Sequence, residues 1–526
     1  MVTGDFWVLF AMLLYFIVVV IIGFIYAKKS NRSTEEYFLG GRSLGPWLTA
    51  LSAEASDMSG YLLMGLPGLA YFCGANEAVW TAIGLAIGTY LNWKFVAKRL
   101  RKYSEVAGNA ITIPDFFSNR FHDKKNILMT IAAVIILLFF SIYVGSCFVT
   151  CGKLFATLFG LDYATMMVLG ALVVFLYTFV GGYLAVSTTD LIQGTIMICA
   201  LVIVFVGSVA QAGGVENTVA FLNSLPGFLN GTQQAVPIVD TSGNQLIVDG
   251  LPAFGEPTEY GIIAIISCLA WGLGYFGMPH ILLRFMAIEE EKKLVLSRRI
   301  ATVWVLISMC VAILIGIIGY GASVAGSIPM FTTSSQSETV IIQFAHLLGQ
   351  NGFLLSLVAG VVLAGILACT MSTADSQLLT AASGVSQNLL QDFLKIKMST
   401  AASMNAARLT VMGIAIVAVF LAWNPDSSVF TIVSFAWAGF GASFGPLVLF
   451  ALFWRRTNMQ GALAGMLTGG VMVFVWKYLV RPLGGNFNIY ELLPAFVLSC
   501  LAIVIVSLLT KEPSKEIYDE FDSVGK

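Results

Sequence analysis

The stretch Ala53 to Gly60, AEASDMSG, decides how the rest of the chain is interpreted. It lies in the middle of an apolar segment, residues 47–72, that is long enough to cross a bilayer of about 30 Å at about 1.5 Å per helical residue. Glu54 and Asp57 therefore fall near the membrane midplane, where a carboxylate costs roughly 2.5–3.5 kcal/mol on insertion scales. Acids at that depth are candidates for a functional site.

Residues that disfavour a regular helix surround these two acids. They are Ser56, Ser59, Gly60, Gly65, Pro67 and Gly68. Broken backbone inside a membrane must be buried or line a cavity, and its freed carbonyl groups can hold a cation. We expect an interrupted helix with this role. The alternative is a kinked helix whose acids are satisfied by neighbouring side chains.

The composition defines the class of protein. Of 526 residues, 58% are hydrophobic and 11% charged, with a mean hydropathy of +0.87. A soluble domain could not bury so much apolar surface, so we expect an all-α polytopic membrane protein. The apolar start of the chain has no basic n-region and predicts an uncleaved first helix. The eight cysteines lack CxxC spacing and the three histidines are scattered, so neither a zinc site nor an organic cofactor nor a nucleic-acid partner is expected.

Thirteen apolar runs are long enough to span a membrane. They cover residues 6–26, 47–72, 77–97, 127–157, 161–182, 188–213, 259–286, 300–325, 352–382, 408–424, 429–453, 461–480 and 490–510. All but three of the 28 Lys and Arg residues fall on one side of this topology, the exceptions being Lys153, Lys477 and Arg481. Basic residues collect on the cytoplasmic side, which predicts an outside N-terminus and an inside C-terminus in a bacterial plasma membrane.

A second interrupted span is predicted at Trp271 to Pro279, WGLGYFGMP, within the seventh helix. Broken segments at corresponding positions of two halves indicate an inverted repeat with a binding site between its halves. The expected core is therefore a five-plus-five repeat with broken second and seventh helices. The expected units are residues 1–45 (first helix and inner loop), 46–213 (first repeat), 214–258 (outer loop), 259–453 (second repeat), 454–510 (two further helices) and 511–526 (cytoplasmic tail).

The composition of two further segments predicts how they are structured. Within residues 387–407, QNLLQDFLKIK is amphipathic and is expected to lie along the membrane surface. The tail KEPSKEIYDEFDSVGK is polar and is expected to be disordered.

A third polar cluster, CTMSTADSQLL at residues 369–379, lies in the ninth span. Ser372 and Thr373 supply hydroxyl oxygens and Asp375 supplies a carboxylate. Hard cations prefer several oxygen donors, so these hydroxyls and the carbonyls of the broken second helix could form a sodium site. The alternative is that both hydroxyls bond to their own helix, as is common in membrane proteins.

Aromatic residues near the breaks could form a solute pocket. Tyr61, Tyr143, Trp271 and Tyr275 lie near the predicted membrane middle rather than in the interfacial belts. A pocket needs apolar walls with a few oriented polar groups, and the free N–H groups of a broken helix can hold a carboxylate. The alternative is that these rings fill space between helices.

Five strings carry a resemblance to a known family: GGRSLGPWLTALSAEASDMSG, LLMGLPG, WGLGYFGMPHILLRF, MSTADSQLL and FAWAGFGASFGP. Together they resemble the sodium/solute symporters, and within them the sodium/proline symporters, over essentially the whole chain. The resemblance implies an inverted-repeat carrier that exposes its site alternately to each side of the membrane.

The resemblance also implies roles for particular residues. The implied sodium ligands are backbone oxygens of Ala55, Met58 and Cys369 and the hydroxyls of Ser372 and Thr373. The implied proline-binding residues are Ser59, Gly60, Tyr61, Tyr143, Trp271, Tyr275 and Pro279. Asp57 matches the essential aspartate of the family, and Asp190 matches an acid on the inner ion path.

The chain departs from the family pattern at three of these positions. Tyr61 stands where the proline carriers have Trp, Cys369 replaces a small Ala, and Glu54 replaces a small or neutral residue. Glu54 could bond to neighbouring helices, tune the ion site or carry a proton. The outer loop after the sixth helix is also longer than the resemblance implies.

The expected function is inward symport of sodium and L-proline across a lipid bilayer, with one sodium ion per proline. Because Tyr61 differs from the family pattern, the alternative solutes are another small amino acid, a betaine or a vitamin acid. A solute-binding membrane sensor is the alternative from another class, although no kinase or receiver domain is recognised. An enzyme is not expected, because no nucleophile and base stand at suggestive spacing.

Overall fold

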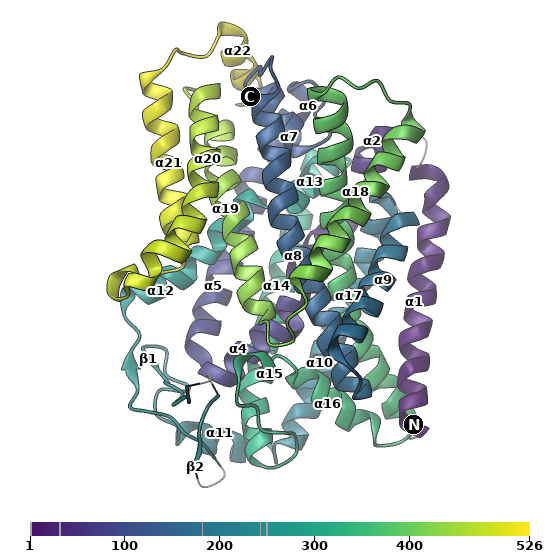
Figure 1. Cartoon of the computed structure of the whole chain (residues 1–526), viewed down its shortest axis with the longest axis vertical. Coiled ribbons are helices and arrows are strands. Elements are labelled where there is room, and N and C mark those ends of the chain that lie inside the picture. Colours follow the sequence, from purple (N-terminus) through teal and green to yellow (C-terminus); the bar gives the residue numbers. More distant parts are fainter. Residues whose placement is uncertain (1–2, 31–32, 181, 242–243, 249–250, 526) are drawn as a thin grey trace.

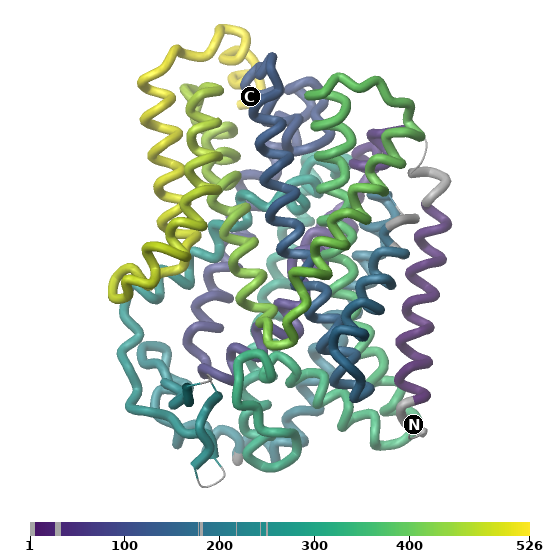
Figure 2. Tube along the Cα trace, in the orientation of Figure 1, coloured from purple at the N-terminus to yellow at the C-terminus, as the bar shows by residue number. Residues whose placement is uncertain are grey.

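The computed structural model describes residues 3–30, 33–180, 182–241, 244–248 and 251–525. Within them the protein is a bundle of long helices that run between two ends (Figure 1). The chain enters the bundle at one end and its last helix lies across the other (Figure 2).

The elements alternate between long helices and short connecting ones, and η denotes 3-10 or π helices. The first half contains α1 (Thr3–Ser30), α2 (Thr34–Leu39), η1 (Gly40–Arg42), α3 (Pro46–Gly60), η2 (Tyr61–Gly65), α4 (Leu66–Cys73), α5 (Ala75–Leu91), η3 (Asn92–Val96), α6 (Ala97–Val106), α7 (Ile113–Arg120), α8 (Ile127–Phe159), α9 (Tyr163–Val180), α10 (Tyr183–Gln211) and α11 (Val215–Asn223).

The second half follows a loop with short strands. Its helices are α12 (Ile262–Leu269), η4 (Ala270–Gly277), α13 (Pro279–Ala287), η5 (Glu291–Lys293), α14 (Leu294–Val324), α15 (Ser334–Ser337), α16 (Val340–Gly349), α17 (Phe353–Ser383), η6 (Gly384–Phe393), α18 (Thr400–Leu421), α19 (Val429–Phe453), α20 (Met459–Val475), η7 (Trp476–Val480), η8 (Arg481–Leu483), η9 (Gly485–Phe487), α21 (Leu492–Leu509) and α22 (Lys515–Gly525).

Helices occupy all thirteen ranges that the apolar runs predict. Among the described residues, nine helices are individually long and apolar enough to span a membrane, and the pair Ile262–Gly277 and Pro279–Ala287 makes a tenth. The other three ranges hold α3 with its continuation, α5 and α9. The expected all-α polytopic class is therefore confirmed.

The second span is interrupted where the sequence predicts it. Ser59 has φ 45° and ψ −165°, which no helix contains, and the π-helical turn η2 follows before the chain resumes as α4. A serine with positive φ is strained, so the surrounding contacts must hold it there. This break points the backbone on either side of Ser59 in different directions.

The seventh span is interrupted in a different way. The 3-10 segment η4 ends at Gly277, Met278 is extended, and α13 then starts with Pro279 as its first residue. The two parts are bent by 49°. Proline suits this position because the first helical N–H has no partner within the helix. The prediction of broken second and seventh helices is confirmed.

The loop between α10 and α12 is not a plain coil. Besides α11, it contains two short antiparallel pairs: β1 (Gln233–Gln234) with β4 (Thr258–Glu259), and β2 (Ile247–Val248) with β3 (Leu251–Pro252). Asn76, at the start of α5, donates a side-chain hydrogen bond to the Gln233 carbonyl. The loop is thereby held against the bundle.

The expectation of an amphipathic surface segment within residues 387–407 is wrong. Residues 384–393 continue α17 directly as the π-helical η6, which packs against α7, α8 and α18. The predicted polar face exists, but it meets other helices. Gln387, for example, donates to Ser403 on α18 at 2.6 Å.

The expectation of a disordered tail is also wrong. Residues 515–525 form α22, whose buried side chains are Ile517, Phe521 and Val524. Their spacing of four and three residues places them on one face of a helix. The guanidinium group of Arg99 lies 4.8 Å from the centre of the Phe521 ring, so the tail docks on α6.

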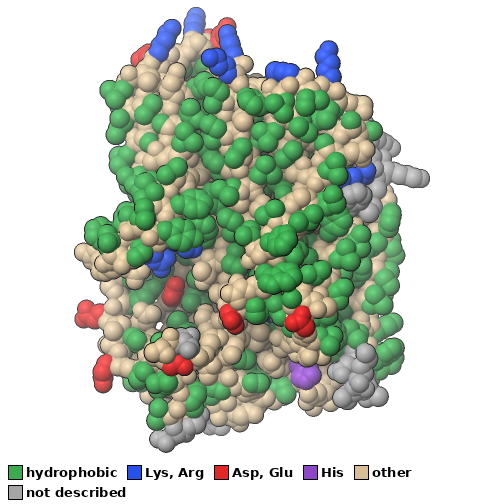
Figure 3. Space-filling model, in the orientation of Figure 1, with side chains coloured by type: hydrophobic (Ala, Val, Ile, Leu, Met, Phe, Trp, Pro, Cys, Tyr) green, Lys and Arg blue, Asp and Glu red, His purple; other side chains and the backbone are tan. Residues whose placement is uncertain are grey.

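Basic side chains gather at the end of the bundle where α6, α7 and α22 lie, which we call the basic end (Figures 1 and 3). The sides of the bundle between the two ends are covered mainly by hydrophobic side chains (Figure 3). The start of α3 belongs to the basic end, because the Leu44 N–H donates to the Ala287 carbonyl there.

Candidate functional site

The predicted sodium ligands come together from two elements. Ser372 on α17 donates its hydroxyl to the Ala55 carbonyl of α3 at 2.7 Å, and the same hydroxyl lies 3.2 Å from the Cys369 carbonyl. Thr373 donates to the Cys369 carbonyl at 3.0 Å, and Met58 is buried one residue before the break. Carbonyl and hydroxyl oxygens thus face one another across α3 and α17, and each retains lone pairs for a cation.

Side chains replace regular helical bonding at the break in the second span. The Tyr143 hydroxyl of α8 donates to the Asp57 carbonyl at 3.1 Å and lies 3.5 Å from Ser59 Oγ. Ser59 Oγ also accepts from the Tyr61 N–H at 3.2 Å. The break is therefore held by α8 from outside, and Ser59 and Tyr143 both take part in it.

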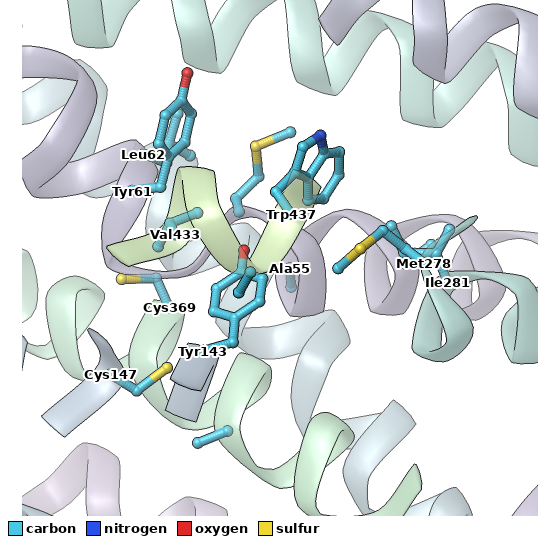
Figure 4. Close-up of a cluster of buried hydrophobic side chains, with 14 of the residues drawn as sticks. Ala55, Tyr61, Leu62, Tyr143, Cys147, Met278, Ile281, Cys369, Val433 and Trp437 are labelled. Atoms are coloured by element: carbon cyan, nitrogen blue, oxygen red, sulfur yellow. The ribbon is translucent and has the colours of Figure 1, made fainter. Parts of the chain in front are cut away.

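Four of the predicted solute-binding residues and Asp57 line one small cavity. Figure 4 shows some of its walls, including Tyr61, Tyr143 and Trp437, which converge from different elements. The lining residues are Asp57, Met58, Tyr61, Leu85, Tyr143, Trp271, Tyr275, Val433 and Trp437. The cavity measures about 10 Å³, room for about one water molecule and too little for an amino acid.

Asp57 supplies the charged group of this cavity. One of its carboxylate oxygens accepts a hydrogen bond from the Tyr275 hydroxyl at 2.7 Å, across from the second broken span. Its other oxygen has no hydrogen-bond partner among the described residues. Asp57 is only 4% exposed, so this free oxygen is a strong local attraction for a cation or an ammonium group.

Aromatic rings form the opposite wall. The ring of Trp271 lies 5.4 Å from that of Tyr61 and 5.3 Å from that of Phe430, and Trp437 donates its indole N–H to the Trp271 carbonyl at 2.8 Å. The residues Leu85, Phe430, Val433 and Trp437 were missed by sequence reasoning. The string FAWAGFGASFGP, which contains Trp437, was the signal that could have found one of them.

Three predicted solute-binding residues lie outside the cavity lining: Ser59, which bonds to Tyr143 and Tyr61 at the break, and Gly60 and Pro279. Gly60 packs against α8, and a Cβ added to it would lie 2.1 Å from Thr150 Oγ1, so its place is one of close approach. Pro279 begins α13 on the far side of the bend. Both lie at the breaks in the helices, where they determine the path of the backbone and do not line the cavity.

Glu54 faces away from the cavity. One of its carboxylate oxygens accepts from the Trp93 indole N–H of η3 at 3.1 Å, and the other has no hydrogen-bond partner among the described residues. At 2% exposed it is as buried as the sodium ligands. Of the roles left open for it, bonding to a neighbouring helix is the one that the structure displays.

Asp190 lies closer to the basic end, in a polar cluster with Arg284. The guanidinium group of Arg284 donates to Asp190 at 3.1 Å, to Ser376 at 2.6 Å and to the His280 carbonyl at 2.8 Å. Ser52 donates to the same Asp190 oxygen at 2.6 Å. The cluster joins α3, α10, α13 and α17, which include the helices that hold the predicted sodium ligands.

Asp375 belongs to the same cluster through Ser376, whose hydroxyl donates to it at 3.3 Å. The guanidinium group of Arg284 therefore pairs with Asp190 directly and is linked to Asp375 through the Ser376 hydroxyl. Arg284 was not singled out in the sequence, although a lone basic residue inside the predicted span 259–286 was a usable signal.

A second buried ion pair lies toward the opposite end of the bundle. Lys153 of α8 lies 2.6 Å from Glu338, between α15 and α16, and also donates to the Ser335 carbonyl and hydroxyl. The remaining donors to the Glu338 carboxylate are Ser428 Oγ and the N–H groups of Val429 and Phe430. Glu338 therefore caps the start of α19, where backbone N–H groups favour an anion.

Taken together, a buried polar site lies between two interrupted helices of a membrane-spanning bundle. Backbone and hydroxyl oxygens face one side of the first break, and a carboxylate and aromatic rings face the other. This arrangement is typical of secondary transporters, which bind a solute and a coupling ion at the interface of two repeats.

The family assignment agrees. The model of the sodium:solute symporter family matches residues 37–469, and this chain belongs to that family. Among curated relatives, the sodium/proline symporter of Salmonella typhimurium is 41% identical over 512 residues, covering 96% of this chain and 94% of the relative. The sodium/proline symporter of Staphylococcus aureus is 42% identical over 516 residues, covering 97% and 94%.

Solved structures share the fold. A substrate-bound, outward-open sodium-coupled sialic acid symporter superposes with a TM-score of 0.76 at 18% identity, covering 97% of this chain and 99% of that one. Mhp1, a nucleobase-cation-symport-1 family transporter in a closed conformation, gives 0.52 at 13% identity, covering 94% and 100%.

Proposed function

We propose that this protein carries sodium and L-proline together into the cell, one ion per solute, by exposing its buried site alternately to each side of the membrane. The observation that carries this proposal is the bond between Ser372 and the Ala55 carbonyl. It joins α17 to α3 only two residues before Asp57, which lines the cavity. One short segment of α3 therefore contributes to the predicted sodium site and to the predicted solute pocket.

Coupling follows from that shared segment. Sodium bound to the oxygens of Ala55, Met58, Cys369, Ser372 and Thr373 would fix the position of α3 against α17. The position of α3 sets where Asp57 and Tyr61 stand. A ligand shifts a conformational equilibrium only by its differential affinity for the two states, so sodium must favour the solute-competent arrangement.

In this proposal residues 46–213 and 259–453 are the two inverted repeats, each beginning with its interrupted span. The basic end faces the cytoplasm of a bacterial cell, because Lys and Arg collect on that side. The N-terminus is then outside and the C-terminus inside, with α22 on the inner surface. Asp190 and Asp57 have ion-coupling roles, and Glu54 acts through its bond to Trp93.

The driving force is adequate for accumulation. One charge falling through 100 mV contributes about 2.3 kcal/mol, and a tenfold sodium gradient adds about 1.4 kcal/mol. With one sodium per proline, a zwitterion without net charge would accumulate roughly 500-fold. The names of the two curated relatives support proline as the solute.

A different small solute is the second candidate. Tyr61 stacks on Phe430 and packs against Trp271 in a tilted arrangement, and so shapes the cavity wall at a position where the resemblance implies Trp. A smaller ring with a hydroxyl group gives that wall a different shape and polarity from Trp, which supports another small amino acid, a betaine or a vitamin acid as the second candidate.

Uptake of labelled L-proline into proteoliposomes tests the proposal. We expect accumulation only with an inward sodium gradient, and its loss in the double variant Ser372→Ala, Thr373→Ala. Thr370→Ala is the matched control, because its hydroxyl bonds only to the Ile366 carbonyl of its own helix, and it should keep uptake. Sodium-dependent uptake of another solute but not proline would favour the second candidate. Binding without uptake of any solute would favour a sensor.

A further inference from the structure

A groove on the side of the bundle is open toward the surrounding membrane between α3, α10 and α14. Its volume is about 440 Å³, within the range of about 300–1,000 Å³ for pockets that bind organic ligands. The lining residues are Trp47, Leu51, Gly194, Thr195, Ile198, Cys199, Arg299, Ile300, Val303, Trp304 and Ile307. Nearly all of these present apolar surface.

Of the lining residues with polar groups, Trp47 and Arg299 stand at the same end of the groove, and the Thr195 hydroxyl donates to the Leu191 carbonyl of its own helix. Trp47 is the second residue of α3, is 59% exposed and belongs to the basic end. Arg299 lies in the first two turns of α14, and no carboxylate of the described residues lies within 4.0 Å of its side chain. An indole and an unpaired cation therefore border an apolar channel at the depth where lipid headgroups begin.

The floor of the groove is the back of the predicted sodium site. A Cβ added to Gly194 of α10 would lie 3.4 Å from Ala55 Cβ and 3.5 Å from the Leu51 carbonyl oxygen, so α10 and α3 are in close contact there. The Gly194 carbonyl accepts the Trp304 indole N–H at 3.1 Å, which ties α14 to the same point. A molecule in the groove touches Leu51, one helical turn from Ala55.

We propose that this groove binds one anionic phospholipid of the cytoplasmic leaflet. An acyl chain lies along the apolar wall, the phosphate pairs with Arg299, and Trp47 lies at the level of the ester groups. Charge complementarity selects this occupant, because the negative surface of the cytoplasmic leaflet meets a guanidinium group that pairs with no carboxylate in the described part of the chain. The placement in that leaflet rests on the proposed orientation, with the basic end inside.

The lipid would support the half of α3 that carries Ala55. Its chain fills the space behind Leu51, so α3 is packed on both faces: by α17 at the Ser372 bond and by the lipid at the groove. Loss of the lipid would leave α3 less well held, which predicts weaker sodium binding rather than a change of solute preference.

Quenching by brominated lipid tests the site without any transport. Wild type and Trp47→Phe are each reconstituted into two kinds of phosphatidylcholine vesicle. In the first kind, a tenth of the phosphatidylcholine carries brominated chains. In the second kind, an added tenth of phosphatidylglycerol carries them instead. Because the chain has 10 tryptophans, the fluorescence of Trp47 is obtained by subtracting the signal of Trp47→Phe from that of the wild type in the same vesicles. One paired Arg near an anionic headgroup corresponds to about fivefold enrichment, so we expect markedly stronger quenching by the brominated phosphatidylglycerol.

Arg299→Gln should abolish that preference, and Arg299→Lys should retain it. Arg298→Gln is the matched control, because it removes the same charge at the same depth, but its guanidinium group lies over the Tyr90 ring of α5 instead. Thr195→Phe fills the groove and should lower quenching by either lipid. Equal quenching by both lipids in the wild type, or a preference that survives Arg299→Gln, would overturn the proposal.

Uptake then separates this site from the proposed function. With phosphatidylglycerol present, wild type and Arg298→Gln should show a lower half-saturating sodium concentration than Arg299→Gln, and in pure phosphatidylcholine the three should agree. A quenching preference without any sodium-coupled uptake would keep the lipid site and reject the symport. Uptake whose sodium dependence ignores lipid charge and Arg299 would reject the support of α3 by lipid.

Discussion

The two buried ion pairs of the bundle differ in how completely their oxygen atoms are bonded. Both oxygens of Glu338 are used, by Lys153, by Ser428 and by the first N–H groups of α19. Asp190 uses one oxygen for Arg284 and Ser52, and its other oxygen has no hydrogen-bond partner among the described residues. The first pair is a completed helix cap, whereas the second still has a carboxylate oxygen that can accept a hydrogen bond.

The helices that the pairs join explain the difference. Glu338 and Lys153 fasten a loop and α8 to the start of α19, and the Ser337 hydroxyl beside them holds the Gly68 carbonyl of α4. Arg284 and Asp190 join α3 to α13, the two helices that border the breaks, and to α17. A completed cap stabilises one arrangement, while an incompletely bonded cluster between helices that must move can rearrange at smaller cost.

The largest effect is expected from Arg284→Gln. The substitution leaves Asp190 buried without its cation partner, and breaking a buried pair costs about 3–5 kcal/mol. We expect a strongly lowered unfolding temperature in detergent and no proline uptake. Adding Asp190→Asn to this variant should recover much of the stability, because one uncompensated charge is removed. An Arg284→Gln protein as stable as wild type would show that this cluster holds no charge.

A smaller loss is expected from Glu338→Gln, toward the other end of the bundle. The amide keeps one acceptor for the N–H groups of α19, and Lys153 retains the Ser335 oxygens, so the cost should be about 3 kcal/mol, at the lower end for a broken buried pair. The same melting measurement checks it, with Lys153→Met, Glu338→Gln as the compensated control. A loss larger than that of Arg284→Gln would reverse the comparison.

The smallest effect concerns a half-buried acid that has no ion-pair partner among the described residues. Asp115 caps α7 outside the membrane-spanning helices, where burial and the nearby Asp392 raise its pKa from 3.8 to about 6. The folded state therefore holds the proton more tightly than the unfolded state. The stabilisation is fully present below about pH 4 and is lost as pH rises through about 6.

Between pH 5 and pH 7 this group should lower the free energy of unfolding by about 1 kcal/mol. Denaturation followed across that range measures it. Asp115→Asn should remove this part of the pH dependence, while Asp519→Asn, in the exposed tail region, should leave it unchanged. A pH profile that is identical in wild type and Asp115→Asn would mean that Asp115 stays ionised.

Features that depend on one segment could be predicted from the sequence. The spans follow from apolar runs, and the breaks follow from Ser59, Pro279 and the glycines around them. The match of Ala55 with Ser372 was predicted from the resemblance, and the structure places these residues in contact. Local composition and known motifs were therefore enough to predict the spans, the breaks and this contact.

Beyond the contacts that the resemblance implied, features that depend on which segments meet could not be predicted. Arg284 was not linked to Asp190, because nothing in either span says which helix faces it. The tail was misjudged because its charge outweighed the regular spacing of Ile517, Phe521 and Val524, and their partner, α6, lies more than 400 residues away in the chain. Phe430 packs against two rings of the cavity wall, Tyr61 and Trp271, through the same kind of remote contact.

The most direct test of the central claim, that one segment of α3 binds sodium and solute together, is equilibrium binding of labelled L-proline with sodium or potassium as the only cation. The account predicts that sodium tightens proline binding in the wild type and that proline tightens sodium binding by the same factor. In Ser372→Ala, Thr373→Ala the weak binding seen in potassium should remain while the sodium effect disappears. Proline binding that is equally tight in both salts, or a sodium effect that survives the double substitution, would contradict it.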